Sequence, residues 1–272
     1  LDRGTCYFRE HILNLWDMHQ KDGHVDDQTW MELVLWATIC YRLINRISTF
    51  DEYGGIPSID EWPLFRTFLR EKEADEEVIF TDAHTVCCGL TRYVSNMNKL
   101  YENDGKLVKE VSSEILECCK GERDEILKQC FKKVKKVDGI GAFFAWQVTC
   151  DLHESQCLAD SNENDWTELG PGAENGIKLI FEDSKCDART YLELAVLLQS
   201  IQNDVYDALG LKFPKWNGLP LTLKNIEHPL CEFKKYIAIQ ENLQAGYKPK
   251  GQRKIKSRTG MDMEKACHYV EK

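Results

Sequence analysis

The sequence predicts an all-α protein, and three observations point to that class. Apolar residues recur every three or four positions through most of the long segments, which is the spacing of amphipathic helices. No stretch of any length alternates apolar and polar residues as a half-buried strand does. No internal repeat of the length typical of solenoids is present. With 272 residues, 43% of them hydrophobic, the chain is long enough to bury a full core.

The helical pattern varies in strength along the chain. It is strongest over residues 30–48, where Asp26, Asp27 and Thr29 offer capping side chains just ahead of a nearly apolar run from Trp30 to Cys40. We expect this helix to lie at the centre of the core. The expected helices cover residues 7–20, 30–48, 59–69, 87–101, 108–119, 123–136, 142–149, 177–181 and 188–209, and the segment 221–240 holds a dense set of ionisable groups.

A glycine turn joins two of these helices within residues 131–152. Gly139 and Gly141 flank one apolar residue, which is the spacing of a helix-hairpin-helix motif. Such a turn presents backbone N–H groups to a nucleic-acid phosphate, and Lys133 and Lys136 add positive charge beside it. The alternative is an ordinary helix–turn–helix of the core.

The end of the apolar helix carries a second candidate site. Arg42 and Arg46 lie four residues apart, so on one continuous helix they share a face, with Asn45 and Tyr41 beside them. Guanidinium groups suit phosphate oxygens, and the pattern favours an anion or base site. A single arginine here would do no more than complement the helix dipole.

A third candidate is the segment Gly170-Pro171-Gly172, which precedes a helical pattern. Its free backbone N–H groups, up to Ala173, suit an anion at a helix start. No Gly-Lys-Ser/Thr follows, so it is not a nucleotide-binding P-loop. A simple tight turn is the alternative.

Charge and cysteine content restrict the class of partner and the compartment. The net charge of −10 argues against a general polyanion binder, so the basic residues between Lys248 and Arg258 suggest directed phosphate contacts, with a solvated tail as the alternative. The basic residues counted as DNA-backbone candidates in this segment are Lys248, Lys250, Arg253 and Lys254. Twelve scattered cysteines without paired CxxC motifs indicate reduced thiols in a nuclear or cytoplasmic protein, with no structural metal site.

The ends of the chain and its apolar runs give two further expectations. No apolar run approaches the length of a membrane span, so we expect no membrane partner. Because the chain begins at Leu1, without a methionine or a signal-like segment, we expect an excised domain.

Five separate blocks resemble one known family. The blocks are YRLINR at 41–46, FTDAH at 80–84, GIGAFFAWQVTCDL at 139–152, LGPGAENG at 169–176 and NIEHPLCEFKKY at 225–236. In this order they resemble the α-glutamyl/putrescinyl thymine pyrophosphorylases, which are DNA-hypermodification enzymes related to helix-hairpin-helix DNA glycosylases. One departure is Ile237, which stands where the family pattern continues with an arginine.

The resemblance implies a helical, glycosylase-like fold with a cleft for an extruded base. It divides the chain into a helical extension (1–29), a glycosylase-like domain (30–243) and a basic segment (244–272). The implied partners are double-stranded DNA with a modified thymine and a small amine or amino acid. The implied reaction displaces pyrophosphate from a 5-hydroxymethyluracil derivative with that amine, and whether a divalent or monovalent cation assists is left open.

The resemblance also implies roles for individual residues. Asp151 or His228 would take the proton from the amine, while Glu232 and Lys235, three apart, would orient the base or the nucleophile. Cys231 is either a nucleophile or a structural thiol. The implied substrate- and pyrophosphate-binding set comprises Tyr41, Arg42, Asn45, Arg46, His84, Gln147, Gly170, Gly172, Ala173 and Cys231.

Two other functions fit the same residues. A DNA glycosylase acting on a modified pyrimidine would use an aspartate some way beyond the hairpin glycines, and Asp160 lies near that spacing in a polar segment. A non-catalytic reader would grip a modified base without changing it. The sequence leaves all three functions open.

Overall fold

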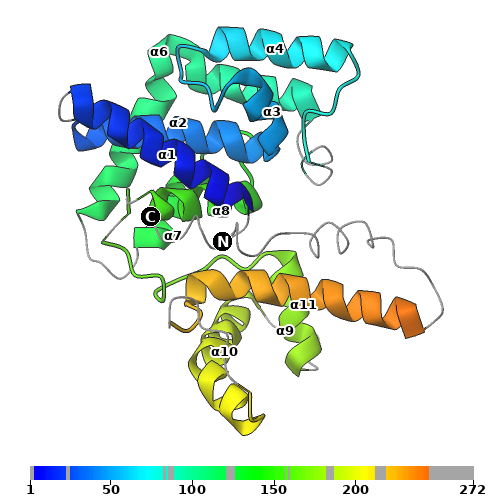
Figure 1. Ribbon diagram of the computed structural model, residues 1–272. Helices are drawn as coiled ribbons and strands as arrows, with labels where there is room; N and C mark the ends of the chain where they lie inside the picture. Colours follow the sequence, from blue (N-terminus) through cyan, green and yellow to red (C-terminus); the bar gives the residue numbers. More distant parts are fainter. Residues whose placement is uncertain are drawn as a thin grey trace. The chain divides into compact units, whose positions relative to one another are not determined.

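The computed structural model confirms the all-α class. Its described part contains ten helices and no strand (Figure 1). The structure describes residues 3–22, 25–81, 84, 89–120, 126–155, 157–158, 160–181, 187–211 and 219–244.

The chain divides into two compact units, residues 1–166 and 167–272, which are described separately. The boundary at Trp166 is not one that the sequence predicted. The first unit contains seven described helices, and its core takes in residues of the predicted N-terminal extension, Phe8 and Ile12. These helices are α1 (Arg3–Asp22), α2 (Asp27–Ile44), α3 (Ile47–Tyr53), α4 (Trp62–Ala74), α6 (Gly89–Cys119), α7 (Ile126–Lys135) and α8 (Ala142–Glu154).

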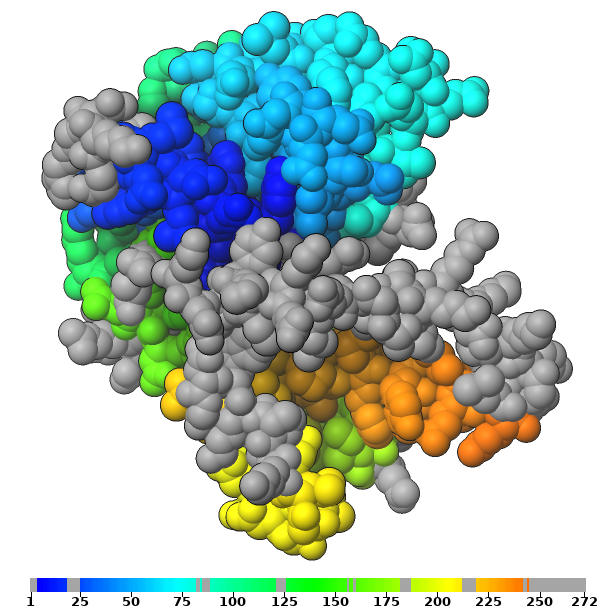
Figure 2. All heavy atoms as spheres, viewed as in Figure 1, coloured from blue at the N-terminus to red at the C-terminus, as the bar shows by residue number. Residues whose placement is uncertain are grey.

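Helix α2 is the centre of the first unit, as its apolar sequence predicted. Asp26 caps it by accepting from the Thr29 N–H, and nearly every residue from Met31 onward is buried. It packs against α6 and α8, and α1 lies beside it. Figure 2 shows α1 in dark blue at the surface; its Leu13 is exposed while its Phe8 is buried. The amphipathic pattern of α1 therefore covers one side of α2.

The end of α2 differs from the prediction. The helix stops at Ile44 because Asn45 adopts a left-handed conformation (φ 52°) and returns its N–H to the Tyr41 carbonyl at 2.7 Å. Arg46 follows in extended conformation and precedes α3. The expectation that Arg42 and Arg46 share one helix face is therefore wrong, because the chain changes direction between them.

Two other boundaries show the effect of local chemistry. The predicted break between helices near residues 101–108 is present as a kink in α6, where Asn103, Asp104 and Gly105 all have positive φ. Helix α4 runs on to Ala74, past its predicted end. Buried Lys72 forms ion pairs with Glu52 and Glu77 there, so this stretch is not simply a solvated acidic segment.

The second unit contains three described helices, α9 (Pro171–Phe181), α10 (Ala188–Ala208) and α11 (Leu223–Gln244). Helix α9 packs closely on α11 because two glycines face it. A Cβ added at Gly176 would lie 2.2 Å from the Leu230 carbonyl oxygen, and one at Gly172 would lie 2.4 Å from Cys231 Sγ. The Gly-Pro-Gly segment therefore forms the first turn of α9, where proline is favoured, and its glycine serves packing. Residues four apart lie on the same side of a helix, so the spacing of Gly172 and Gly176 is a sequence signal for this contact that sequence reasoning missed.

Among the described helices, none is long and apolar enough to cross a lipid bilayer. The cysteines whose side chains the structure describes are free thiols. Two of these described cysteines, Cys40 and Cys130, are fully buried.

Candidate functional site

A buried ion pair joins α2 to α8. Arg42 Nε lies 2.5 Å from Asp151 Oδ2 and Nη2 lies 2.6 Å from Oδ1, so the guanidinium holds the carboxylate through two nitrogens. Arg42 is 3% exposed and Asp151 is fully buried. Buried charges of this kind require a partner, and these two residues, 109 positions apart, supply each other.

The Arg42 guanidinium has further partners around the pair. Its Nη2 donates to Thr5 Oγ1 at 2.9 Å, its Nη1 donates to Asn45 Oδ1 at 3.4 Å, and it lies 5.6 Å from the centre of the Tyr41 ring. An incoming phosphate would have to replace one of these partners. The geometry therefore favours Arg42 as the residue that positions Asp151, and direct contact with pyrophosphate stays a prediction.

His84 is 5% exposed and is influenced by the charge of Arg42. Burial, and then the positive charge of Arg42, lower the pKa of His84 from 6.5 to about 4, so the ring is neutral at pH 7. Its Nδ1 is 2.6 Å from Thr81 Oγ1, while its Nε2 has no hydrogen-bond partner in the described part of the chain. The ring also lies against Phe144 and Phe143, with centroids 5.5 and 6.1 Å away. The site therefore contains one buried polar atom that a ligand can satisfy.

Helix α8 connects this site to the hairpin turn. It begins after Gly141, and Phe143, Gln147 and Asp151 follow at intervals of four along one side of the helix. Asp151 is buried and Gln147 is half-buried, while Phe143 is 56% exposed. Sequence reasoning selected Gln147 and Asp151 but missed Phe143. The signal for it was a large aromatic residue in the first turn after the glycines.

The hairpin turn requires glycine at only one of its two predicted positions, because Gly141 is extended (φ −81°) with open space around it, whereas Gly139 is not. Helices α7 and α8 pack on each other, and Gly139 between them has φ 86°. A Cβ at Gly139 would lie 2.2 Å from Asn96 Oδ1, and Asn96 Nδ2 donates to the Gly139 carbonyl at 3.4 Å. Only glycine fits both this conformation and this space.

The basic residues of the hairpin are differently placed. Lys133 pairs with Glu114 at 2.7 Å, whereas the Lys136 side chain is exposed. Contact of the hairpin with a DNA backbone stays a prediction. The basic candidates outside the described residues are Lys248, Lys250, Arg253 and Lys254.

A second group of predicted residues gathers between the start of α9 and the first half of α11. Cys231 lies against Gly172, and burial raises the pKa of its thiol. Glu232 Oε1 accepts from Lys235 Nζ at 2.6 Å, which confirms that these two residues share a helix face. Ala173 is fully buried in the core of this unit. Cys231 therefore resembles a packed thiol more than an activated nucleophile.

His228 and Gly170 belong to the same group. His228 is exposed, and its Nδ1 lies 3.5 Å from Glu227 Oε2. The other Glu227 oxygen faces Gly170, 3.5 Å from where a Cβ would stand. The predicted residues thus form one group in each unit, and a single pocket that holds both groups stays a prediction.

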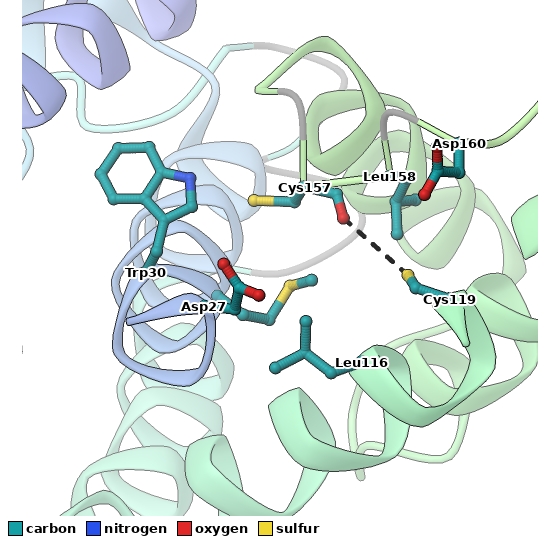
Figure 3. Close-up of a pocket in the computed structure, with 8 residues that line it drawn as sticks. Asp27, Trp30, Leu116, Cys119, Cys157, Leu158 and Asp160 are labelled. Carbon is teal, nitrogen blue, oxygen red and sulfur yellow. Dashed lines mark hydrogen bonds between the residues drawn. The ribbon is translucent and has the colours of Figure 1, made fainter. Parts of the chain in front are cut away.

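The first unit also contains a hollow of about 210 Å³ between the start of α2, the end of α6 and the segment after α8 (Figure 3). Its walls include Trp30, Cys119 and Cys157. Burial raises the pKa of Cys119 to about 11 and that of Cys157 to about 12, so both thiols stay protonated at neutral pH. Asp160, the candidate aspartate of the glycosylase alternative, lines this hollow, but none of the residues predicted for the base and pyrophosphate site does.

Comparison with known proteins decides the family. The family model described as the helical domain of 5-hmdU DNA kinase matches residues 2–245. This chain belongs to that helical-domain family. The 5-hmdU DNA kinase of Bacillus phage SP10 is 26% identical over 255 residues, covering 87% of this chain and 38% of the phage protein. The chain thus spans well under half the length of that relative. No solved structure matches it.

Membership in the 5-hmdU DNA kinase helical-domain family confirms part of the resemblance. The predicted link to enzymes that modify 5-hydroxymethyluracil in DNA holds at the level of the family. The match does not show that the chain belongs to the narrower family of thymine pyrophosphorylases. The all-helical architecture agrees with a family defined as a helical domain.

Proposed function

We propose that this helical domain holds a 5-hydroxymethyluracil-derived base of DNA for a transferase reaction at its 5-methylene group. The proposal draws on the family match and on the name of the phage relative. The observation that carries it is the buried, neutral His84, whose Nε2 has no partner among the described residues and whose pKa is lowered in part by the charge of Arg42.

The chemistry of His84 suits such a base. A buried nitrogen without a hydrogen bond costs about 1–3 kcal/mol, so a ligand that supplies the bond gains this energy. Neutral imidazole accepts from the 5-hydroxymethyl group or donates to a pyrimidine carbonyl, depending on its tautomer. Asp151, held by Arg42, is the second polar group in this region and the candidate proton acceptor.

The hairpin and Phe143 are the parts of the first unit proposed to contact the DNA around the extruded base. The 5-methylene group of a paired base enters a closed site only after the nucleotide is extruded from the duplex. Phe143 is exposed, contacts the ring of His84, and follows the glycine turn by two residues. An aromatic ring in this place suits stacking against a base beside an opened helix.

The narrower reaction is also a proposal. An amine nitrogen bonds to the 5-methylene carbon, the bond from that carbon to the pyrophosphate oxygen breaks, and the amine proton passes to Asp151 or His228. The phage relative is named as a kinase, and a kinase transfers a phosphoryl group to the hydroxyl oxygen on the same carbon. Both reactions require the same base to be held.

The test uses duplex DNA with one 5-hydroxymethyluracil, and matched DNA with thymine. Fluorescence anisotropy should show tighter binding to the modified duplex, and His84→Ala should remove that preference. His11→Ala is the matched control, because burial also lowers the pKa of this α1 histidine to about 4. Equal binding of the two duplexes by the unaltered chain, at low and at moderate salt, would overturn the proposal.

Mass spectrometry of the DNA then separates the reactions. The chain is incubated with ATP and the hydroxymethyl duplex, or with putrescine and a duplex carrying the pyrophosphorylated base. A phosphorylated base supports the kinase reaction, and an amine adduct with free pyrophosphate supports the displacement. An abasic site would overturn the transferase in favour of a glycosylase, and preferential binding with unchanged DNA would favour a reader.

A further inference from the structure

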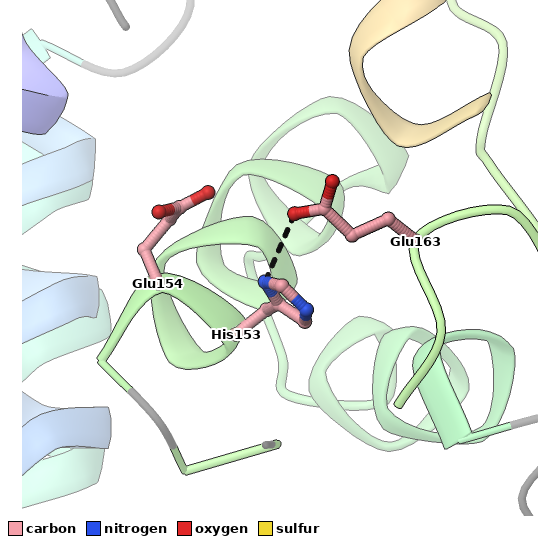
Figure 4. A group of neighbouring side chains, drawn as sticks. All are labelled: His153, Glu154 and Glu163. Carbon is pink, nitrogen blue, oxygen red and sulfur yellow. Dashed lines mark ion pairs between the residues drawn. The ribbon is translucent and has the colours of Figure 1, made fainter. Parts of the chain in front are cut away.

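Three side chains that none of the predicted functions uses converge at the end of α8. His153 and Glu154 belong to the last turn of that helix, and Glu163 comes from the segment that follows it (Figure 4). One ligand atom from each lies within 4.8 Å of the others, and His153 Nδ1 is 3.5 Å from Glu163 Oε1. No other trio of His, Cys, Asp or Glu in the described part of the chain meets this condition.

The three side chains are sheltered but not sealed. The side chains of His153, Glu154 and Glu163 are 16, 17 and 27% exposed, respectively. Two carboxylates are thus held close together in partly dehydrated surroundings, which is unfavourable unless positive charge is nearby. The negative end of the α8 dipole falls at the same place and adds to the preference for a cation.

The backbone holds Glu163 in place relative to α8. The Cys157 N–H donates to the Leu152 carbonyl at 3.0 Å, and Ser161 N–H donates to the Leu158 carbonyl at 2.9 Å. Beyond Glu163, the Trp166 ring packs against Phe131, with centroids 5.1 Å apart. The segment is therefore attached on both sides of Glu163, which reduces the entropy lost when a ligand fixes its side chain.

We propose that His153, Glu154 and Glu163 bind one divalent cation of the first transition row, such as Mn²⁺ or Zn²⁺. One imidazole nitrogen with two carboxylate oxygens suits these ions, whereas Mg²⁺ and Ca²⁺ prefer oxygen ligands alone. Water completes the coordination. The ion ties the last turn of α8, two residues beyond Asp151, to the segment 157–166. This site does not depend on the proposed function.

Arg9 contacts one of the three side chains and would compete with the cation for it. Its Nη1 lies 3.8 Å from Glu154 Oε2, and its side chain is 42% exposed. A bound divalent ion would displace this weak contact, because exposed ion pairs of this length contribute little. Arg9→Ala should therefore strengthen metal binding without harming the fold.

The experiment measures free Mn²⁺ by electron paramagnetic resonance during titration of the metal-free chain. Mn²⁺ is the probe because the many thiols would bind Zn²⁺ nonspecifically. We expect one Mn²⁺ per chain. The affinity for Mn²⁺ should fall at least about tenfold in His153→Gln and in Glu163→Gln, since each variant removes one of the three ligands. Glu227→Gln is the matched control, because it breaks another His–Glu contact of 3.5 Å that lacks a third ligand.

Two further readouts keep the test decisive. Zn²⁺ should displace the bound Mn²⁺, and Mn²⁺ should raise the midpoint of thermal unfolding of the unaltered chain more than that of Glu163→Gln. If a glutamine variant fails to fold, the gain in affinity for Arg9→Ala decides. Absence of Mn²⁺ binding to the unaltered chain, or equal affinity in His153→Gln and Glu227→Gln, would overturn the site. DNA is absent throughout, so failure here leaves the proposed base site untouched.

Discussion

The Asp151 carboxylate binds the Arg42 guanidinium through two nitrogens, at 2.5 and 2.6 Å, in the interior of the first unit. This pair connects the last turn of the central helix to α8, the helix that follows the glycine hairpin. It also places a positive charge close to His84 and so contributes to the lowered pKa of that ring. Predictions about stability and about pH follow from the same contact.

Removing one partner of the pair should destabilise the fold. Arg42→Ala leaves the Asp151 carboxylate buried without its partner, and we expect a loss of about 3–5 kcal/mol in the free energy of unfolding. Urea denaturation of the variant and of the unaltered chain measures this loss in the free energy of unfolding. Arg46→Ala is the control, since this half-buried arginine donates to Ser48 and should cost far less. Equal losses for the two variants would contradict a structural role for the pair.

The lowered pKa of His84 predicts how the stability of the fold depends on pH. Its folded pKa of about 4 lies below the unfolded value of 6.5, so the unfolded chain takes up a proton first as the pH falls. The stabilisation from the neutral ring is therefore complete above pH 6.5 and is lost as the pH falls toward 4. Each pKa unit is worth about 1.4 kcal/mol, so the loss is on the order of 3 kcal/mol.

Denaturation at a series of pH values tests this slope with two variants. His84→Gln should flatten the fall in stability between pH 6.5 and 4, and His11→Gln should flatten it through the second lowered histidine. A double variant should show the shallowest slope. If His84→Gln follows the curve of the unaltered chain, the ring is not buried in its neutral form.

The glycines of α9 should differ in their tolerance of alanine. Gly176→Ala brings a methyl group against the Leu230 backbone oxygen, which does not move without shifting α11, so we expect a loss of about 1–3 kcal/mol. In Gly172→Ala the new methyl group clashes chiefly with the Cys231 sulfur, so the double variant with Cys231→Ala should recover most of the lost stability. Gly141→Ala is the control, because open space surrounds that position. Urea midpoints check the order of the three single variants.

Phe143 should matter for DNA and little for the fold. Its ring is 56% exposed, so Phe143→Ala should change the free energy of unfolding only slightly. If the ring stacks on a base, its removal weakens binding of the hydroxymethyluracil duplex by about 1–3 kcal/mol. Leu64→Ala removes another large exposed side chain (68%) of the first unit and should leave binding unchanged. Anisotropy titrations of both variants measure the difference, and equal affinities would exclude stacking.

Local features of the molecule were readable from the residues themselves. The helical class followed from apolar spacing, because a helix repeats every few positions and its pattern needs no distant partner. The glycine at 139 was predictable for the same reason, since a turn between adjacent helices requires a left-handed residue there. The break in α6 near residue 103 also appeared as a gap in the periodic pattern.

Contacts between distant segments were decided only by packing. Arg42 and Asp151 were both selected as site residues, yet nothing in the sequence showed that they bind each other across 109 positions. The left-handed Asn45 separated Arg42 from Arg46, and the close approach of α11 gave Gly172 and Gly176 a packing role. Periodicity reports which face of a helix is buried, but the identity of the neighbour depends on how all the helices pack together, and that is a property of the tertiary structure.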